Sequence, residues 1–196
     1  MNAMPPAVPH AAPYAARLGV DYPARLDRLT SFFRLIWVIP ISVLAGLLTG
    51  LGWPAVALMI AARQRYPRWW FDYSRELTRF STRILAYVAL LTDRYPSTED
   101  EQSVHLELDY PDVPRDLNRW MPLIKWLLAI PHYIVLGILG IFVFFAVLIA
   151  WFAILFTGSY PRSLFDFVVG FMRWTLRVNA YAFLMLTDRY PPFSLR

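Results

Sequence analysis

The stretch LTDRYP occupies residues 91–96 and recurs at residues 186–191, close to the end of the 196-residue chain. Six identical residues at two places indicate either one motif with a role at two sites or a duplication of the whole chain. Four further correspondences occur in the same order in both halves, which favours duplication. The sequence therefore predicts two copies of one unit of about 90 residues.

The further correspondences pair short motifs of the first half with motifs of the second half. They are Asp21-Tyr22-Pro23 with Asp109-Tyr110-Pro111, Arg34–Pro40 with Lys125–Pro131, Tyr66-Pro67-Arg68 with Tyr160-Pro161-Arg162, and Arg79 and Arg83 with Arg173 and Arg177. On this basis residues 17–96 form the first repeat and residues 104–196 the second. Residues 1–16, rich in Pro and Ala, are predicted to be a disordered N-terminal arm, and residues 97–103 an acidic linker.

The composition is that of a membrane protein. Hydrophobic residues make up 58% of the chain and charged residues 17%, whereas a soluble domain has roughly 45–50% and 25%. Residues 37–62 and 126–160 contain no Asp, Glu, Lys or Arg. Each run exceeds the about 20 apolar residues that cross a bilayer as a helix. We therefore expect an integral membrane protein.

Each unit has the same predicted order of structure. An extended stretch comes first, at 18–22 and again at 104–110, where apolar and polar residues alternate as in a half-buried strand. A long apolar helix follows, with a proline that kinks its entry (Pro40, Pro131). A Tyr-Pro-Arg turn then leads to a second helix, which ends at LTDRYP.

The second helix of each unit carries charged residues at helical spacing. Such a face indicates either an interfacial helix or a span whose polar side looks into a bundle. We expect an all-α integral membrane fold, a tandem parallel repeat of two helices each. Its four helices would span or nearly span the membrane, with the extended segments on one membrane face, where they can pair.

Two alternative arrangements stay open. In the first, each unit has one span, the second helices are interfacial and the two copies have opposite orientations. In the second, both apolar runs form membrane hairpins that dip from one side, the first of them turning at residues 49–54. We also expect the N-terminus to be cytoplasmic, although the arginine and lysine counts on the two faces differ little.

Two sets of residues are candidates for function. Arginines beside interfacial turns are expected to contact lipid headgroups or a partner protein; they are Arg65, Arg68, Arg94, Arg162 and Arg189. A second set forms an intramembrane ion-pair network or polar stripe: Asp72, Glu76, Arg79, Arg83, Asp166, Arg173 and Arg177. Buried charges are costly in a bilayer, so the second set is expected either to hold helices together through ion pairs or to line a pathway.

The sequence offers little enzymatic chemistry. There is no cysteine, the three histidines are isolated, and none of the common catalytic or nucleotide-binding motifs occurs. No catalytic residue, metal or cofactor is predicted. The basic residues are scattered among apolar ones, which argues against nucleic acid. Membrane lipids, favoured by the net charge of +5, and other membrane-protein subunits are the expected partners.

The chain resembles a bacterial integral membrane family that is catalogued as a domain of unknown function. The residues that carry the resemblance are AILFTGSYPRSLFDFVVGFMRW (153–174), AYAFLMLTDRYPPFSL (180–195) and IPHYIVLGIL (130–139). It is strong over 118–195 and looser over 17–96. The resemblance implies a polytopic membrane protein without an assigned reaction and carries over no catalytic residues. We expect a multi-pass protein of the bacterial inner (cytoplasmic) membrane.

These observations favour a non-catalytic accessory or scaffolding subunit of a larger membrane complex. The alternative is a small transporter or channel with its pathway at the interface between the repeats. A membrane lipid-handling enzyme is a third hypothesis. A hydrated path lined by the arginines of the polar stripe would favour the transporter, whereas their engagement in ion pairs would favour the subunit.

Overall fold

A short antiparallel ribbon lies in the middle of the molecule. The computed structural model describes residues 14–48, 52–98 and 102–196. Strand β1 (Ala16–Val20) pairs with β2 (Val104–Leu108), with Ala16 opposite Leu108. The residues of β2 alternate between buried and exposed, as the apolar alternation of a half-buried strand predicts. The ribbon thus joins the first half of the chain to the second.

The first half continues with α1 (Arg28–Leu48), α2 (Gly52–Arg63) and α3 (Arg68–Val88). The Asp27 carboxylate accepts the backbone N–H groups of Leu29 (2.7 Å) and Thr30 (3.1 Å), so it caps the start of α1. The apolar run 37–62 is divided between α1 and α2. Pro54 lies in the first turn of α2, where its missing N–H leaves no helical bond unmade.

The second half contains α4 (Val113–Asp116), α5 (Met121–Leu128), α6 (Ile130–Thr157) and α7 (Arg162–Ala182). Pro131 stands in the first turn of α6, directly after the break from α5. Gly158 ends α6 with a left-handed conformation (φ 74°), which a residue without Cβ adopts without strain.

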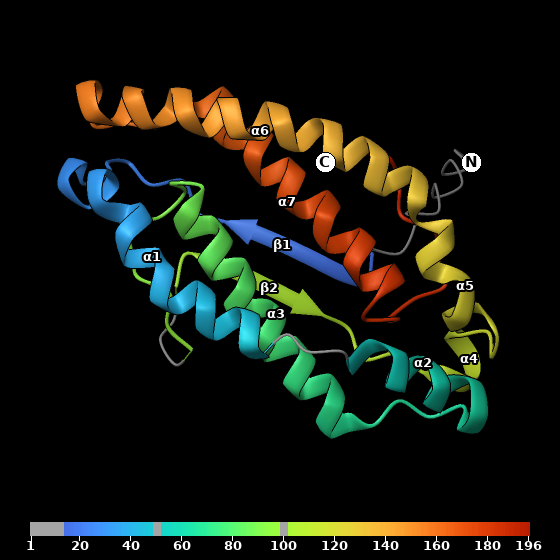
Figure 1. Cartoon of the computed structure of the whole chain (residues 1–196). Coiled ribbons are helices and arrows are strands. Elements are labelled where there is room, and N and C mark those ends of the chain that lie inside the picture. Colours follow the sequence, from blue (N-terminus) through green and yellow to red (C-terminus); the bar gives the residue numbers. More distant parts are fainter. Residues whose placement is uncertain (1–13, 49–51, 99–101) are drawn as a thin grey trace, which may run out of the picture.

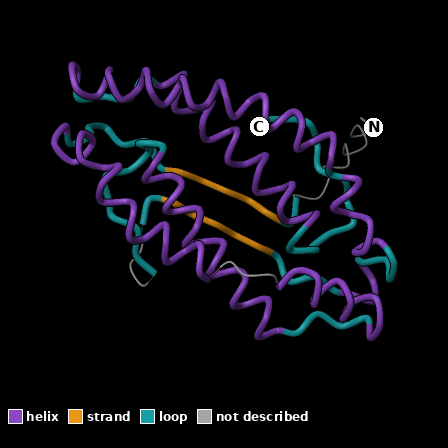
Figure 2. Tube along the Cα trace, in the orientation of Figure 1, coloured by secondary structure: helices purple, strands orange, loops and turns teal. Residues whose placement is uncertain are grey.

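The helices form two layers on the ribbon (Figure 1). Helix α7 packs against β1 and α3 against β2, while α6 packs against α7 and α1 against α3. Helices α1 and α6 meet near the start of α1 and diverge from there (Figure 2). The main core therefore lies between the ribbon and the two inner helices α3 and α7, and it includes Leu18, Val104 and Phe165.

The prediction of a four-span, multi-pass membrane fold is wrong. Within the described residues, one helical stretch is long and apolar enough to cross a membrane, and it covers Met121–Thr157. Helix α2 has 12 residues, too few for a span. Helices α3 and α7 use their buried faces to cover the ribbon rather than to meet lipid.

Of the two alternatives, the arrangement with oppositely oriented copies requires the extended segments to lie apart. The pairing of β1 with β2 contradicts it. Of the predicted N-terminal arm, residues 14–16 are described, and Ala16 already belongs to β1. Residues 1–13, and residues 99–101 of the predicted linker, lie outside the described residues.

Candidate functional site

The aspartate of the second LTDRYP motif binds a fully buried lysine. One Asp188 carboxylate oxygen lies 2.7 Å from Lys125 Nζ, and the other accepts the backbone N–H of Asn118. Lys125 Nζ also donates to the Thr187 carbonyl (2.8 Å) and lies 5.4 Å from the centre of the Tyr181 ring. Burial lowers the pKa of Lys125, and the carboxylate opposes this shift. The motif thus ties the end of α7 to α5.

The first LTDRYP motif makes matching contacts. Asp93 forms an ion pair with the buried Arg34 and accepts the Asp27 backbone N–H (2.6 Å). Arg34 donates to the Tyr87 carbonyl (2.7 Å), and its guanidinium lies 4.4 Å from the centre of the Tyr87 ring. Sequence reasoning assigned a role to the arginine of the motif and missed its aspartate. The signal was present, because Arg34 and Lys125 are paired positions of the predicted repeats.

Each Tyr-Pro-Arg turn contacts the Asp-Tyr-Pro motif of the other half. The Tyr110 hydroxyl donates to the Tyr66 carbonyl (2.6 Å), and Arg68 lies over the Tyr110 ring at 5.2 Å. The equivalent contacts at the other end are the Tyr22 hydroxyl to the Tyr160 carbonyl and Arg162 over the Tyr22 ring at 4.5 Å. These contacts interlock the two halves at both ends of the ribbon.

The buried tyrosines of these turns provide a test of the packing by pH. Tyr160 is 1% exposed, and its hydroxyl has no hydrogen-bond partner in the described part of the chain. Tyr66 is also buried, at 4% exposed, but its hydroxyl donates to the Leu184 carbonyl (2.9 Å). Burial raises the pKa of both hydroxyls. The unfolded chain then loses these protons at about pH 10 while the folded chain keeps them, so stability falls as the pH rises above about 10.

We expect Tyr160→Phe to change the free energy of unfolding at neutral pH by less than about 1 kcal/mol and to reduce the alkaline loss of stability. Tyr66→Phe should reduce the alkaline loss equally but cost about 1 kcal/mol at neutral pH, because it deletes a hydrogen bond. Urea unfolding of both variants at pH 7 and pH 11 measures this. An unchanged alkaline slope in both would contradict the prediction.

The predicted polar stripe divides into two kinds of contact. On α3 the acids form surface pairs, Asp72 with Arg75 (3.5 Å) and Glu76 with Arg79 (2.7 Å). Asp166 pairs in the same way with Arg162 (3.3 Å) at the start of α7. All of these side chains are about one third or more exposed, so each pair contributes little to stability.

The remaining stripe arginines bind backbone carbonyls. Arg83 donates to the Ser97 carbonyl (2.5 Å) and Arg177 to the Ser194 carbonyl, so each folds the segment after LTDRYP back on its helix. Arg173 donates to the Leu18 carbonyl of β1 (2.8 Å). These three arginines hold strand β1 and the segments after the two LTDRYP motifs against helices α3 and α7.

The predicted headgroup arginines are all exposed but do not form one cluster. Arg65 and Arg68 lie at the turn between α2 and α3, whereas Arg162 lies at the start of α7, at the opposite end of the molecule (Figure 1). Arg94 and Arg189 follow the two ion-paired aspartates. A hollow of about 930 Å³ lies beside the α2–α3 turn, with Arg63 and Arg65 among its lining residues.

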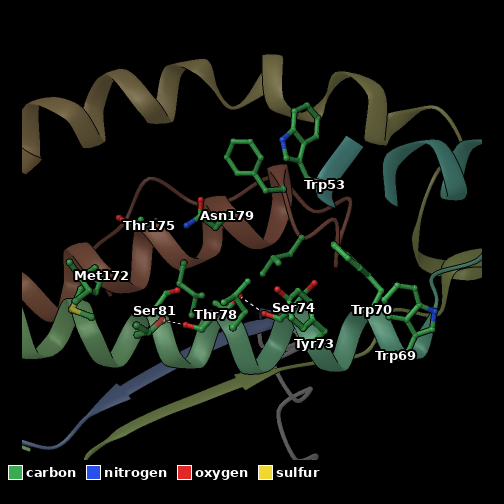
Figure 3. Close-up of a pocket in the computed structure, with 16 residues that line it drawn as sticks. Trp53, Trp69, Trp70, Tyr73, Ser74, Thr78, Ser81, Met172, Thr175 and Asn179 are labelled. Atoms are coloured by element: carbon green, nitrogen blue, oxygen red, sulfur yellow. Dashed lines mark hydrogen bonds between the residues drawn. The ribbon is translucent and has the colours of Figure 1, made fainter. Parts of the chain in front are cut away.

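A groove of about 710 Å³ lies between α3 and α7, and Trp53 of α2 is one of its lining residues (Figure 3). Its described lining residues include no Asp, Glu, Lys, Arg or His. Hydroxyl and amide groups occupy its middle, with Ser74, Thr78 and Ser81 of α3 facing Thr175 and Asn179 of α7 (Figure 3). Aromatic residues gather at the end near the start of α3: Trp53, Trp69, Trp70 and Tyr73.

The threonine hydroxyls of the groove each donate a hydrogen bond to a backbone carbonyl of their own helix. Thr78 donates to the Ser74 carbonyl (2.7 Å), Thr82 to the Thr78 carbonyl (2.7 Å) and Thr175 to the Phe171 carbonyl (2.9 Å). Each hydroxyl proton is thus used within its own helix, and the oxygen lone pairs are left to accept. Sequence reasoning missed this groove. The sequence did carry a signal, because uncharged polar residues recur every four positions along α3 and α7. The charged residues next to them obscured this pattern.

The structure is that of a mostly helical protein with a two-stranded ribbon, and its described residues contain one helical stretch long and apolar enough to cross a membrane. The chain belongs to the family described as a domain of unknown function, DUF4389. The model of this family matches residues 28–98 and 119–194. The chain matches no curated protein and no solved structure.

Proposed function

We propose that the chain is a non-catalytic accessory or scaffolding protein of a bacterial cytoplasmic membrane, attached to lipid through α6 and bound to other membrane proteins. The observation that carries this proposal is the outer face of α6. Ile138, Ile141, Phe142, Phe145 and Ile149 recur at helical spacing, and each is more than half exposed. A contiguous apolar face of this size indicates contact with lipid or with another protein.

The packing of α6 favours a position along the bilayer surface, embedded in one leaflet. Helix α6 packs along α7, and α7 in turn packs against β1 (Figure 1). An upright α6 would carry the exposed ion pairs of Arg17 with Glu107 and Asp109 into the hydrocarbon layer. Exposed charges at that depth are costly. A helix lying in the leaflet buries its apolar face and leaves the ribbon in water.

The arginines support the scaffold over a transporter. Arg83, Arg173 and Arg177 bind backbone carbonyls, and neither they nor Arg79 lines the groove between the two halves. The exposed Arg63 and Arg65 near α2 fit lipid phosphates, since each arginine near an anionic membrane surface contributes about 1 kcal/mol of attraction.

Purification of the full chain from its native membrane in a mild detergent tests the scaffold proposal. We expect a second membrane protein to co-elute at a fixed ratio, identified by mass spectrometry of the peak fraction. The exposed aromatic and apolar residues of α5 and α6 provide the surface for it. A chain that elutes alone, or only with copies of itself, would refute the scaffold role while leaving membrane attachment intact.

A further inference from the structure

We propose that the groove between α3 and α7 binds one molecule of a neutral, single-chain lipid whose head donates hydrogen bonds, of which a monoacylglycerol is the simplest example. The volume of about 710 Å³ lies within the range of small-molecule sites, about 300–1,000 Å³. The proposal deepens the proposed function, because it rests on attachment of the protein to a membrane from which the lipid is taken.

The electrostatics of the groove select a neutral ligand. No charged side chain is among the described lining residues, so a phosphate, carboxylate or ammonium head would lose its hydration without gaining an ion pair. Glu76 and Arg79 of α3 are neighbours in sequence of groove residues, but they pair with each other and are not among the lining residues. An uncharged head avoids this desolvation cost.

The three threonine hydroxyls of the groove favour a head that donates, while the hydroxyls of Ser74 and Ser81 are also able to donate to it. Thr78, Thr82 and Thr175 use their protons within their own helices and present only lone pairs to the groove. A glycerol or other hydroxyl head can donate to these oxygens, whereas an ester or ether oxygen can only accept. The amide of Asn179, which faces Thr78 across the groove, offers both a donor and an acceptor (Figure 3).

The length and the apolar ends of the groove fit one hydrocarbon chain. Its α3 side runs from Trp69 to Leu85, about 24 Å at the rise of an α-helix. One leaflet of a bilayer has a hydrocarbon thickness of about 15 Å. A head bound at Thr78 leaves the α3 side from Trp69 to Thr78, about 14 Å long, for a chain of nearly that length. Leu77, Leu176 and Phe183 supply apolar walls beside the hydroxyls.

The test is titration of the delipidated full chain in maltoside micelles with monoolein, with methyl oleate as the ligand that has no hydroxyl donor, read by native mass spectrometry. We expect one monoolein per chain and binding of methyl oleate at least about tenfold weaker. The variant T78V/T175V should weaken monoolein about tenfold, which corresponds to the loss of two neutral hydrogen bonds. The variant T78S/T175S, which keeps both hydroxyls, should restore binding.

Thr157→Val is the matched control, because its hydroxyl donates in the same way to the Ala153 carbonyl but lies at the end of α6, outside the groove. Equal binding of monoolein and methyl oleate, or no effect of T78V/T175V, would overturn the proposal. So would a co-purified polypeptide whose removal is required before monoolein binds. Flotation of wild-type protein with vesicles tests membrane attachment separately, and T78V/T175V should float as wild type does.

Discussion

Asp188→Ala is expected to lower the free energy of unfolding by about 3 kcal/mol, because it leaves a buried ammonium group without its counter-charge. Lys125 is 0% exposed, and its only charged partner among the described contacts is the Asp188 carboxylate at 2.7 Å. Burial already lowers the pKa of this lysine. Without the carboxylate, folding must either bury the charge or release its proton, and both cost free energy.

Asp188 is 23% exposed, so water replaces part of the lost contact and the expected cost lies at the lower end of the range for buried pairs. The variant also removes the acceptor of the Asn118 N–H at the approach to α5. Chemical unfolding of the purified chain in detergent, followed by circular dichroism, measures the change.

Two further variants separate the charge from the side chain. Asp166→Ala breaks an ion pair whose members are both more than half exposed, and it should change stability by less than about 0.5 kcal/mol. The double variant Lys125→Met with Asp188→Ala should be more stable than Asp188→Ala alone, since no buried charge remains. If Asp188→Ala and Asp166→Ala lower the free energy of unfolding equally, the burial of Lys125 does not determine the cost of removing its carboxylate partner.

Phe142→Glu is expected to lower the partition of the chain into membranes by about 50-fold. Phe142 is 59% exposed and lies in the middle of the apolar face of α6. A carboxylate placed in the hydrocarbon region costs about 2–3 kcal/mol, which gives this factor. Because the side chain points out of the fold, the variant should keep the helical content of the wild type.

Flotation with vesicles that contain anionic lipid, after removal of detergent, measures the partition. Phe142→Leu should float as the wild type does, because it keeps an apolar side chain. Thr98→Glu is the control for the added charge, because it introduces the same carboxylate at an exposed loop residue. Comparable flotation of Phe142→Glu and Thr98→Glu would exclude α6 as the membrane contact.

The same vesicle preparations also allow the orientation of α6 in the membrane to be measured. The chain has no cysteine, so single labels at Ile134→Cys and Phe156→Cys report the depth of each end. These positions are about 33 Å apart along the helix. A helix lying in one leaflet places both at similar depth, whereas an upright helix places them near opposite surfaces.

The sequence alone predicted much of the local structure. The alternation at 104–108 predicted β2, and the apolar run after Pro131 predicted α6. Matched motifs predicted the repeats, which remain a prediction, although Asp93 and Asp188 make matching ion pairs. These features were readable because strand alternation and helix-terminating prolines depend on neighbours within a few residues.

Only the tertiary structure decided what the apolar faces meet. Hydrophobic periodicity shows that a side chain avoids water, but it does not distinguish lipid from the protein interior. The buried faces of α3 and α7 pack on a ribbon of two strands that lie almost 90 residues apart in the chain, and this packing overturned the four-span prediction. The groove has the same origin, since Thr78 and Asn179 face each other only when both helices lie on that ribbon.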